Sequence, residues 1–353
     1  MRIAVGMSGG VDSSVCALLL KRAGHEVVGV TLRFHTIDEN CSLEDLRVCC
    51  SPEDVKDAVR VSERLGIPHI TLDWEKFFKE RVINYFVREY SEGKTPNPCA
   101  LCNREVKTGF LARYLREVAG IDKLATGHYA KLVEYKGRKM IARSKDESRD
   151  QSYFLTLVKR EDIDLLEFPL GDLTKDEVRR IAKEFNLPVA DKKDSQEVCF
   201  LMGKKPGEFV RERVGTKEGF IVHANGEVLG KHTGIYNFTI GQRRGLKLAY
   251  HEPLYVIGLD AKKNEVVVGK EDMLYKKSLK LESINVHIPL EDWDEVYAMV
   301  RYRTKPVKVK SIREEKDGYF VEFEESVRGI TPGQVCAFYE GDVLLGGGII
   351  TEV

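Results

Sequence analysis

A cysteine pair is the first feature of this sequence whose residue types and spacing suit chemistry. Cys99 and Cys102 lie three positions apart in TPNPCALCNR, residues 95–104. This spacing suits a zinc clip, a redox pair, half of an iron–sulfur site, or a nucleophile with an idle neighbour. The pair alone does not separate these chemistries, so the rest of the chain has to supply the context.

A glycine-rich loop supplies part of that context. GMSGGVDSS, residues 6–14, follows the strand-like run RIAV and leads into the helix-like run VCALLLKRAG. In such a setting, backbone N–H groups and a helix N-terminus bind phosphate. Gly9 and Gly10 let the backbone approach an anion closely, whereas Asp12 would repel a phosphate unless it holds Mg²⁺. The sequence therefore predicts a phosphate site here.

Other interpretations of the loop are weaker. Residues 6–10 fit the G-x-S-x-G nucleophile elbow, but the first strand would carry the nucleophile and no acid and histidine are evident. A P-loop of the G-x-x-x-x-G-K-[ST] kind is excluded because the loop has no lysine. A tight turn without a ligand is the remaining alternative.

SGGVDSS after a first strand resembles the signature of the PP-loop ATP pyrophosphatases, which cut ATP between the α and β phosphates and pass AMP to an oxygen. Further motifs carry a narrower resemblance, to the bacterial tRNA 2-thiouridylase (MnmA) family, over essentially the whole chain. They are TPNPCALCNR, GHYA (127–130), RDQSYFL (149–155), DSQEVCFL (194–201), TIGQRRGL (239–246), RYR (301–303) and TPGQ (331–334).

The resemblance implies a three-domain enzyme that uses ATP and Mg²⁺. Its family adenylates the C2 oxygen of the wobble uridine in the tRNAs for Lys, Glu and Gln, and then inserts sulfur to give 2-thiouridine. A cysteine desulfurase or a relay protein is the implied sulfur donor.

The same resemblance assigns roles to residues. Cys102 matches the nucleophile, and Cys199 matches the cysteine that receives sulfur as a persulfide. The residues that match the family's ATP-binding positions are Gly6, Met7, Ser8, Gly9, Gly10, Val11, Asp12, Ser13, Leu32 and Gly127. The residues that match the family's contacts to the target base are Asn97, Pro98 and Cys99. Those that match its further tRNA contacts are His128, Arg149, Asp150, Gln151, Arg301, Tyr302 and Gln334.

Position 99 departs from part of the family, because many members have aspartate where this chain has Cys99. Cys99, Cys102 and Cys199 would supply three thiolates, which suit a 4Fe–4S cluster with one open iron better than a closed zinc site. The alternative is a persulfide on Cys199 that Cys102 releases or resolves. Both routes remain open. We also expect Asn103 to cap a helix and thereby to lower the pKa of the adjacent Cys102 thiol.

The elements that position these residues fall into two groups. Before residue 203, strand-like runs at 2–7, 27–34, 69–74 and 123–130 alternate with amphipathic helices, which predicts an α/β fold with a parallel PP-loop sheet. The helices fall at 51–66, starting with Ser51 as N-cap, 75–93, 104–120 and 174–188, the last with a Thr174/Glu177 capping box. Beyond 203, turn signals such as Asn225-Gly226 predict antiparallel hairpins and two smaller β-rich domains.

We therefore place a PP-loop ATP-binding catalytic domain at 1–203. A central β-rich domain follows at 204–277, and a β-barrel-like, tRNA-binding domain at 278–353.

Composition limits the partners. The chain has 353 residues, 32% of them charged, and a formal net charge of zero, so tRNA would have to bind local basic patches. The strongest patch is RYRTKPVKVKSIR (301–313), in which Lys308 and Lys310 would give one strand face a positive charge. No targeting segment or membrane-length apolar run is evident, so we expect a cytoplasmic protein.

In a reducing compartment the eight cysteines are not expected to form a disulfide framework. Cys41, Cys49 and Cys50 are expected to serve loop packing. Two competing functions remain: a PP-loop ligase that forms an amide or amidine and needs no thiol, and a non-catalytic RNA-binding protein with a zinc or iron–sulfur site.

Overall fold

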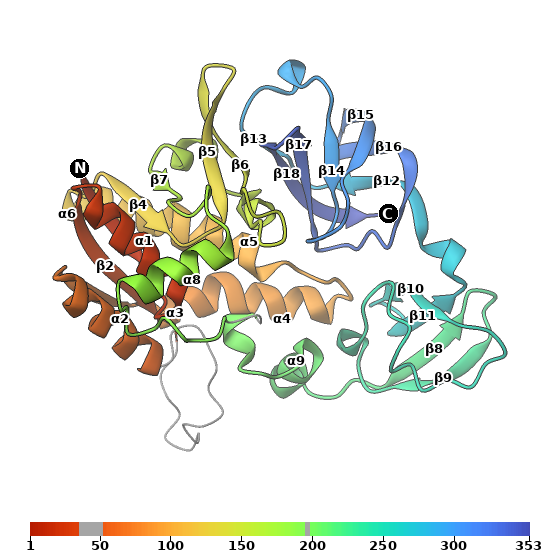
Figure 1. Cartoon of the computed structure of the whole chain (residues 1–353). Helices are drawn as coiled ribbons and strands as arrows, with labels where there is room; N and C mark the ends of the chain where they lie inside the picture. The colour runs from red at the N-terminus through yellow and green to blue at the C-terminus, as the bar shows by residue number, and fades with distance from the viewer. Residues whose placement is uncertain (35–51, 195–197) are drawn as a thin grey trace.

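A computed structural model describes residues 1–34, 52–194 and 198–353 (Figure 1). The predicted N-cap Ser51 and the cysteines at 41, 49 and 50 lie outside these residues. The described chain forms an N-terminal α/β part, a small central sheet and a C-terminal barrel. None of its described helices is both long enough and apolar enough to cross a membrane.

The N-terminal sheet is parallel throughout, with strand order β3-β2-β1-β4-β7, which confirms the predicted fold class. Its strands are β1 (Arg2–Gly6), β2 (Glu26–Arg33), β3 (His69–Asp73), β4 (Lys123–Thr126) and β7 (Leu166–Glu167). Ile3 and Val5 of β1 face one core, and Ala4 faces the other. The central strand β1 is thus buried on both faces, as expected for an apolar strand inside a parallel sheet.

Helices cover each face. One layer contains α1 (Val11–Arg22), α2 (Pro52–Leu65) and α8 (Lys175–Glu184). The other contains two long helical runs, α3 (Glu75–Phe78) with η2 (Lys79–Ile83) and α4 (Asn84–Ser91), and α5 (Pro98–Cys102) with η3 (Asn103–Leu111) and α6 (Ala112–Ala119). The second run ends at Gly120, whose positive φ suits a helix terminus.

The predicted strand at 123–130 is wrong in its second half. β4 ends at Thr126, and β5 (Ala130–Tyr135) leaves for another sheet, where it forms a hairpin with β6 (Arg138–Arg143). The hairpin pairs with β18 (Val343–Glu352) through Ala142 and Val343. The N-terminal part of the chain therefore contributes two strands to the C-terminal sheet (Figure 1).

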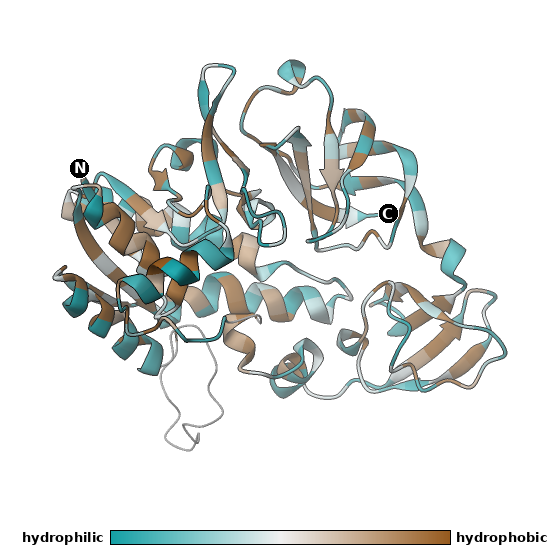
Figure 2. Cartoon of the chain, viewed as in Figure 1, coloured by the Kyte–Doolittle hydropathy of each residue, from teal (hydrophilic) through white to brown (hydrophobic). Residues whose placement is uncertain are grey.

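That sheet runs through β12 (Tyr275–Leu281), β16 (Gly318–Arg328), β15 (Val307–Glu315), β14 (Tyr297–Met299), β17 (Val335–Glu340) and β18. A β12–β18 pairing closes it into a barrel, and β13 (Asn285–Val286) adds to β18. Figure 2 shows hydrophobic residues on the barrel strands and on the N-terminal sheet.

The central sheet has the order β10-β11-β8-β9. Its strands are β8 (Gly219–His223), β9 (Val228–His232), β10 (Tyr255–Asp260) and β11 (Glu265–Gly269), preceded by α9 (Pro206–Val214). The Asn225-Gly226 turn joins β8 and β9 as predicted. Short helices complete the chain: η4 (Ser152–Leu155), α7 (Arg160–Ile163), η5 (Cys199–Leu201), η6 (Ile235–Asn237), η7 (Glu271–Leu274) and η8 (Leu290–Asp292).

Candidate active site

The glycine-rich loop lies at the carboxyl end of β1 and runs into α1, as predicted. Gly10 is the N-cap of this 12-residue helix, and the N-terminus of such a helix favours an anion. Ser13 Oγ accepts a hydrogen bond from the Ser8 N–H at 3.2 Å, which fixes the curve of the loop. Gly9 has φ +69°, and a Cβ there would lie 2.2 Å from the Asp54 carbonyl oxygen. Only glycine fits that position.

The strand order places this loop at a topological switch point. β2 and β3 lie on one side of β1, and β4 lies on the other, which is where open α/β sheets bind ligands. Gly127 follows β4 and packs on the loop, since a Cβ there would lie 2.8 Å from Ser13 N. Leu32 is buried near the carboxyl end of the neighbouring β2. The predicted nucleotide residues thus share one edge of the sheet.

Lys175 is a residue of this site that the sequence analysis missed. Its Nζ lies 2.7 and 2.9 Å from the two carboxylate oxygens of Asp12 and 2.8 Å from Asp194 Oδ1. The Lys175 side chain is only 8% exposed. Tyr129 donates its hydroxyl hydrogen to Asp12 at 2.9 Å. The predicted capping box places Lys175 at the first position of α8, but nothing in the sequence signals that its ammonium reaches the loop.

Lys192 makes a second missed contact to the loop. Its Nζ donates to the Gly9 carbonyl oxygen at 3.0 Å and pairs with Asp54 and Asp57, each at 2.6 Å. One segment, from Lys175 to Lys192, therefore supplies two ammonium groups beside the predicted phosphate site. Cationic side chains here would compensate the repulsion that Asp12 exerts on a phosphate.

Both carboxylate oxygens of Asp12 bind the Lys175 ammonium, so a Mg²⁺ role for Asp12 would require this contact to be exchanged, and it stays a prediction. Among residues 1–34, 52–194 and 198–353, no three His, Cys, Asp or Glu side chains gather as a metal-binding group. Cys99, Cys102 and Cys199 are not among such groups in the described residues, and the 4Fe–4S cluster stays a prediction.

The helix that carries the cysteine pair begins earlier than predicted. Asn97, not Asn103, is its N-cap: the Asn97 side chain accepts a hydrogen bond from Ala100 N at 3.1 Å, and Pro98 occupies the first helical position. Cys99 therefore lies in the first turn, and Cys102 lies beyond it. The expectation that Asn103 caps a helix next to Cys102 is wrong, because Asn103 is buried and donates to the Phe154 carbonyl oxygen at 2.9 Å.

Cys102 and Cys199 belong to one hydrophobic region although they are far apart in sequence. Cys102 is 6% exposed within the core beneath α3 to α6, and Cys199 packs against that core. Phe200 anchors the Cys199 segment, because its ring lies 4.9 Å from the Phe86 ring and 6.0 Å from the Phe78 ring.

The residues predicted from the resemblance to contact tRNA near the loop bind protein groups. Arg149 pairs with Asp194 at 3.3 Å, and Gln151 Oε1 accepts from Tyr129 N at 3.0 Å. Burial raises the pKa of Asp150, whose carboxylate accepts from Ser144 N at 2.9 Å. His128 shares a 2.7 Å hydrogen bond with Thr126, and burial, together with the Lys107 charge, lowers its pKa to about 3.

Arg301, Tyr302 and Gln334 connect the C-terminal barrel to the other parts of the chain. Arg301 donates to the Ile240 carbonyl oxygen at 2.8 Å, and the Tyr302 ring lies 4.5 Å from the Phe154 ring. Gln334 Nε2 donates to the Thr95 carbonyl oxygen at 2.7 Å. The barrel therefore borders both the cysteine motif and the 149–155 segment.

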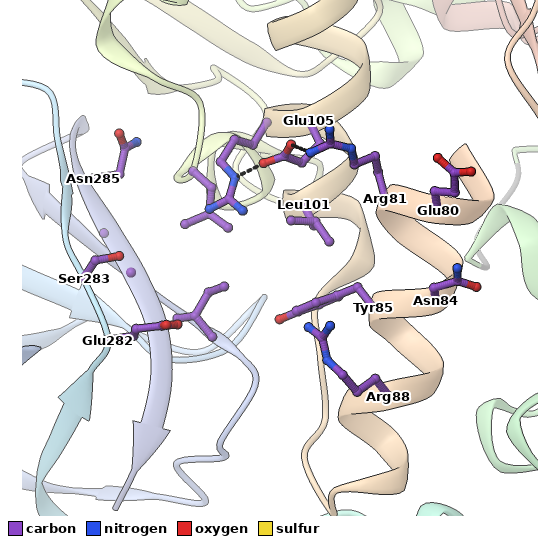
Figure 3. Close-up of a pocket in the computed structure, with 15 residues that line it drawn as sticks. Glu80, Arg81, Asn84, Tyr85, Arg88, Leu101, Glu105, Glu282, Ser283 and Asn285 are labelled. Carbon is purple, nitrogen blue, oxygen red and sulfur yellow. Dashed lines mark hydrogen bonds and ion pairs between the residues drawn. The ribbon is translucent and has the colours of Figure 1, made fainter. Parts of the chain in front are cut away.

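A cavity of about 490 Å³ lies between the barrel and the two helical runs, one containing α4 and the other α5 (Figure 3). Arg81 and Arg104 share Glu105 on one wall, at 3.6 and 2.8 Å. Leu101 contributes to the same wall, and Glu282 to the opposite one. The cavity is thus next to the cysteine helix.

Comparison with known proteins agrees with this arrangement along the whole chain. Residues 1–203 match the model of the tRNA methyl transferase HUP domain, residues 207–270 the tRNA methyl transferase PRC-barrel domain, and residues 276–350 the aminomethyltransferase beta-barrel domain. Among solved structures, a 4-thiouridine synthetase–RNA complex aligns at 16% identity with a TM-score of 0.34, over 58% of this chain and 46% of that chain.

Curated relatives are far more similar. The tRNA-specific 2-thiouridylase MnmA of Aquifex aeolicus is 62% identical, over 100% of this chain and 99% of its own length. The MnmA of Persephonella marina is 52% identical, over 99% of this chain and 100% of its own length. With such identity along its entire length, this chain belongs to the MnmA family of tRNA-specific 2-thiouridylases.

Proposed function

We propose that this protein is a tRNA-uridine 2-sulfurtransferase, which adenylates the C2 oxygen of a wobble uridine and replaces that oxygen with sulfur. The observation that carries the proposal is the full-length identity of 62% to a tRNA-specific 2-thiouridylase. The arrangement of the loop, Gly127 and Lys175 at one edge of the parallel sheet supports the ATP-dependent step.

In the first step the uridine C2 oxygen attacks the α-phosphorus of ATP, the bond between the α- and β-phosphates breaks, and pyrophosphate leaves. The N–H groups of the loop and the N-terminus of α1 would stabilise the charge that develops on the phosphates. Lys175 would meet the triphosphate by exchanging its contact with Asp12. Mg²⁺ is expected to arrive with the triphosphate, since it favours phosphate oxygens.

In the second step sulfur enters from a persulfide on Cys199. Its terminal sulfur loses its proton to solvent and attacks C2, the C2–O bond breaks, and AMP leaves with the oxygen. The Cys102 thiolate then attacks Cys199 Sγ, which releases 2-thiouridine and leaves a Cys102–Cys199 disulfide. An external dithiol must supply the electron pair that reduces this disulfide.

Of the two predicted routes we propose the persulfide route, which needs only Cys102 and Cys199. The association of Cys102 and Cys199 with a single hydrophobic core supports direct transfer between these two thiols. A cysteine desulfurase or a relay protein would load Cys199. The tRNAs for Lys, Glu and Gln are the proposed substrates, met in the cytoplasm.

The test is a reconstituted reaction with ATP, a tRNA transcript and a desulfurase with cysteine. It should give 2-thiouridine by mass spectrometry and pyrophosphate that depends on tRNA. Cys199→Ala should keep the pyrophosphate and lose the thiolation. Retained thiolation in Cys199→Ala, or iron that copurifies anaerobically and is needed for activity, would contradict the persulfide route.

A further inference from the structure

The turn TPGQ, Thr331–Gln334, is fixed to the last strand of the C-terminal barrel. Gly333 N donates to the Ile350 carbonyl oxygen at 2.7 Å, and Ile350 N donates to the Gln334 carbonyl oxygen at 2.8 Å. Gln334 N also donates to the Thr331 carbonyl oxygen at 3.2 Å. Because both ends of the turn are bonded, it is a rigid part of the barrel and not a loose loop.

This turn binds the residue that opens the cysteine motif. Thr95 N donates to the Pro332 carbonyl oxygen at 2.8 Å, and the Thr95 carbonyl oxygen accepts from Gln334 Nε2 at 2.7 Å. Both main-chain polar groups of Thr95 are thus held by the barrel. Gly333 adopts φ +90°, and a Cβ there would lie 3.0 Å from Thr95 N and C, so the two backbones are in close contact.

The chain between Thr95 and Cys99 has little freedom. Pro96 and Pro98 fix their own φ angles, and Asn97 caps the helix that starts at Pro98. A displacement of Thr95 would therefore move the start of this helix, with Cys99 in its first turn and Cys102 next to η3.

A neighbouring segment is held by β17, the strand that follows this turn. Tyr153 is fully buried and donates its hydroxyl hydrogen to the Val335 carbonyl oxygen at 2.7 Å. The next residue, Phe154, accepts the hydrogen bond from Asn103, directly after Cys102. The thiol-bearing helix is thus connected to the turn Thr331–Gln334 at its beginning and, through Tyr153 and Phe154, to β17 behind Cys102.

We propose that Gln334 is a positioning residue through which the C-terminal barrel sets the placement of the helix that carries Cys99 and Cys102. The proposal rests on the proposed function only for the role of these thiols. In the enzyme without tRNA, the Gln334 amide binds the Thr95 carbonyl oxygen. The barrel would therefore help to place the reactive thiols, in addition to binding RNA.

The test measures alkylation of Cys102 by iodoacetamide, resolved by mass spectrometry, with neither tRNA nor ATP present. Gln334→Glu keeps the shape of the side chain but replaces its donor with a carboxylate, and Gln334→Met removes the donor without adding charge. Cys102 is nearly buried, so a weakened attachment of its helix should raise its alkylation rate about fivefold through more frequent local opening.

The matched control is Gln242→Glu. Gln242 Nε2 also donates to a main-chain carbonyl, that of Arg244 at 3.0 Å, but in the central domain. Its substitution should leave the Cys102 rate unchanged. Unchanged Cys102 alkylation in Gln334→Met would overturn the proposal and leave Gln334 as a tRNA contact alone, seen as a higher KM for tRNA. If Gln334→Glu fails to fold, the alkylation rate of Gln334→Met tests the proposal alone. The alkylation rates do not depend on whether the enzyme thiolates tRNA.

Discussion

Lys175 Nζ lies 2.7 Å from Asp12 Oδ1, although 163 positions separate the two residues along the chain. The same ammonium lies 2.8 Å from Asp194, which precedes the Cys199 segment. Lys175 therefore joins the phosphate loop to the part of the chain that carries the second thiol. An ammonium in this place can shift from the carboxylates to a triphosphate, so Lys175 is the cation we expect ATP to meet.

Lys175→Met should lower the rate of tRNA-dependent pyrophosphate release about 100-fold, as expected when one preorganised charge is removed from a transition state. It should also weaken ATP binding, measured by calorimetry. Lys183→Met is the control, because Lys183 lies on the same helix and pairs with Asp191 at the surface, at 3.2 Å.

Removing the Lys175 ammonium also destabilises the fold, by less than the roughly 3–5 kcal/mol of a fully buried pair, because Asp12 is 32% exposed. Both variants therefore need urea unfolding curves, and kinetics should be measured where each is folded. A folded Lys175→Met with normal pyrophosphate release would contradict the role in ATP binding.

Gly127→Ala should weaken ATP binding about tenfold. The new methyl group would lie 2.8 Å from Ser13 N, so the loop that receives the phosphates must shift. Gly258→Ala is the control, since its methyl group would meet only the Val267 side chain at 3.8 Å. Fluorescence titration with an ATP analogue compares them, and equal affinities would show that the contact of Gly127 with the loop does not matter for ATP.

The sequence predicts the parallel sheet and its loop because these features depend on short-range patterns. Apolar and β-branched residues mark β1 to β3, and the Thr174/Glu177 capping box is formed as predicted. The phosphate loop follows from its glycines and from its place between a strand and a helix. Such signals lie within a few residues of one another.

Features that depend on distant partners could not be predicted. The basic side chains Lys308 and Lys310 are paired with acidic residues: Lys308 with Glu295, just before β14, at 3.1 Å, and Lys310 with Glu322 of β16 at 2.8 Å. The choice of Asn97 over Asn103 as N-cap also depends on Phe154, which binds Asn103. The local sequence predicts a strand or a helix cap, but it does not show which distant residue will contact that strand or cap in the fold.

Cys16 and Cys336 should be the slowest described cysteines to react with iodoacetamide. Both are fully buried, and burial raises the pKa of each thiol, so little thiolate forms at neutral pH. Cys99 and Cys199 are partly exposed and should react first. Site-resolved mass spectrometry of a time course checks the order, and early labelling of Cys336 in the folded protein would contradict it.

His287 should make the stability of the protein depend on pH below neutrality. It is 1% exposed, and its ring nitrogens lie 2.9 Å from the Val158 carbonyl oxygen and 3.2 Å from that of Leu344. Burial lowers its pKa below the ordinary 6.5, although the two carbonyls act in the opposite direction, and the nearby Arg160 lowers it further. The folded protein therefore holds a neutral ring that the unfolded chain protonates below pH 6.5.

The contribution of this lowered pKa to stability is complete above pH 6.5 and is lost as the pH falls below it. Between pH 7.5 and 5.5 the free energy of unfolding should fall by about 1 kcal/mol more in the unsubstituted protein than in His287→Gln. Urea unfolding at both pH values measures the difference. His251→Gln, at an exposed ring, is the control and should keep the original pH dependence. An equal fall in the His287→Gln variant would show that folding does not lower the pKa of His287. A smaller fall in the unsubstituted protein than in the variant would show that the folded ring is protonated and donates to both carbonyls.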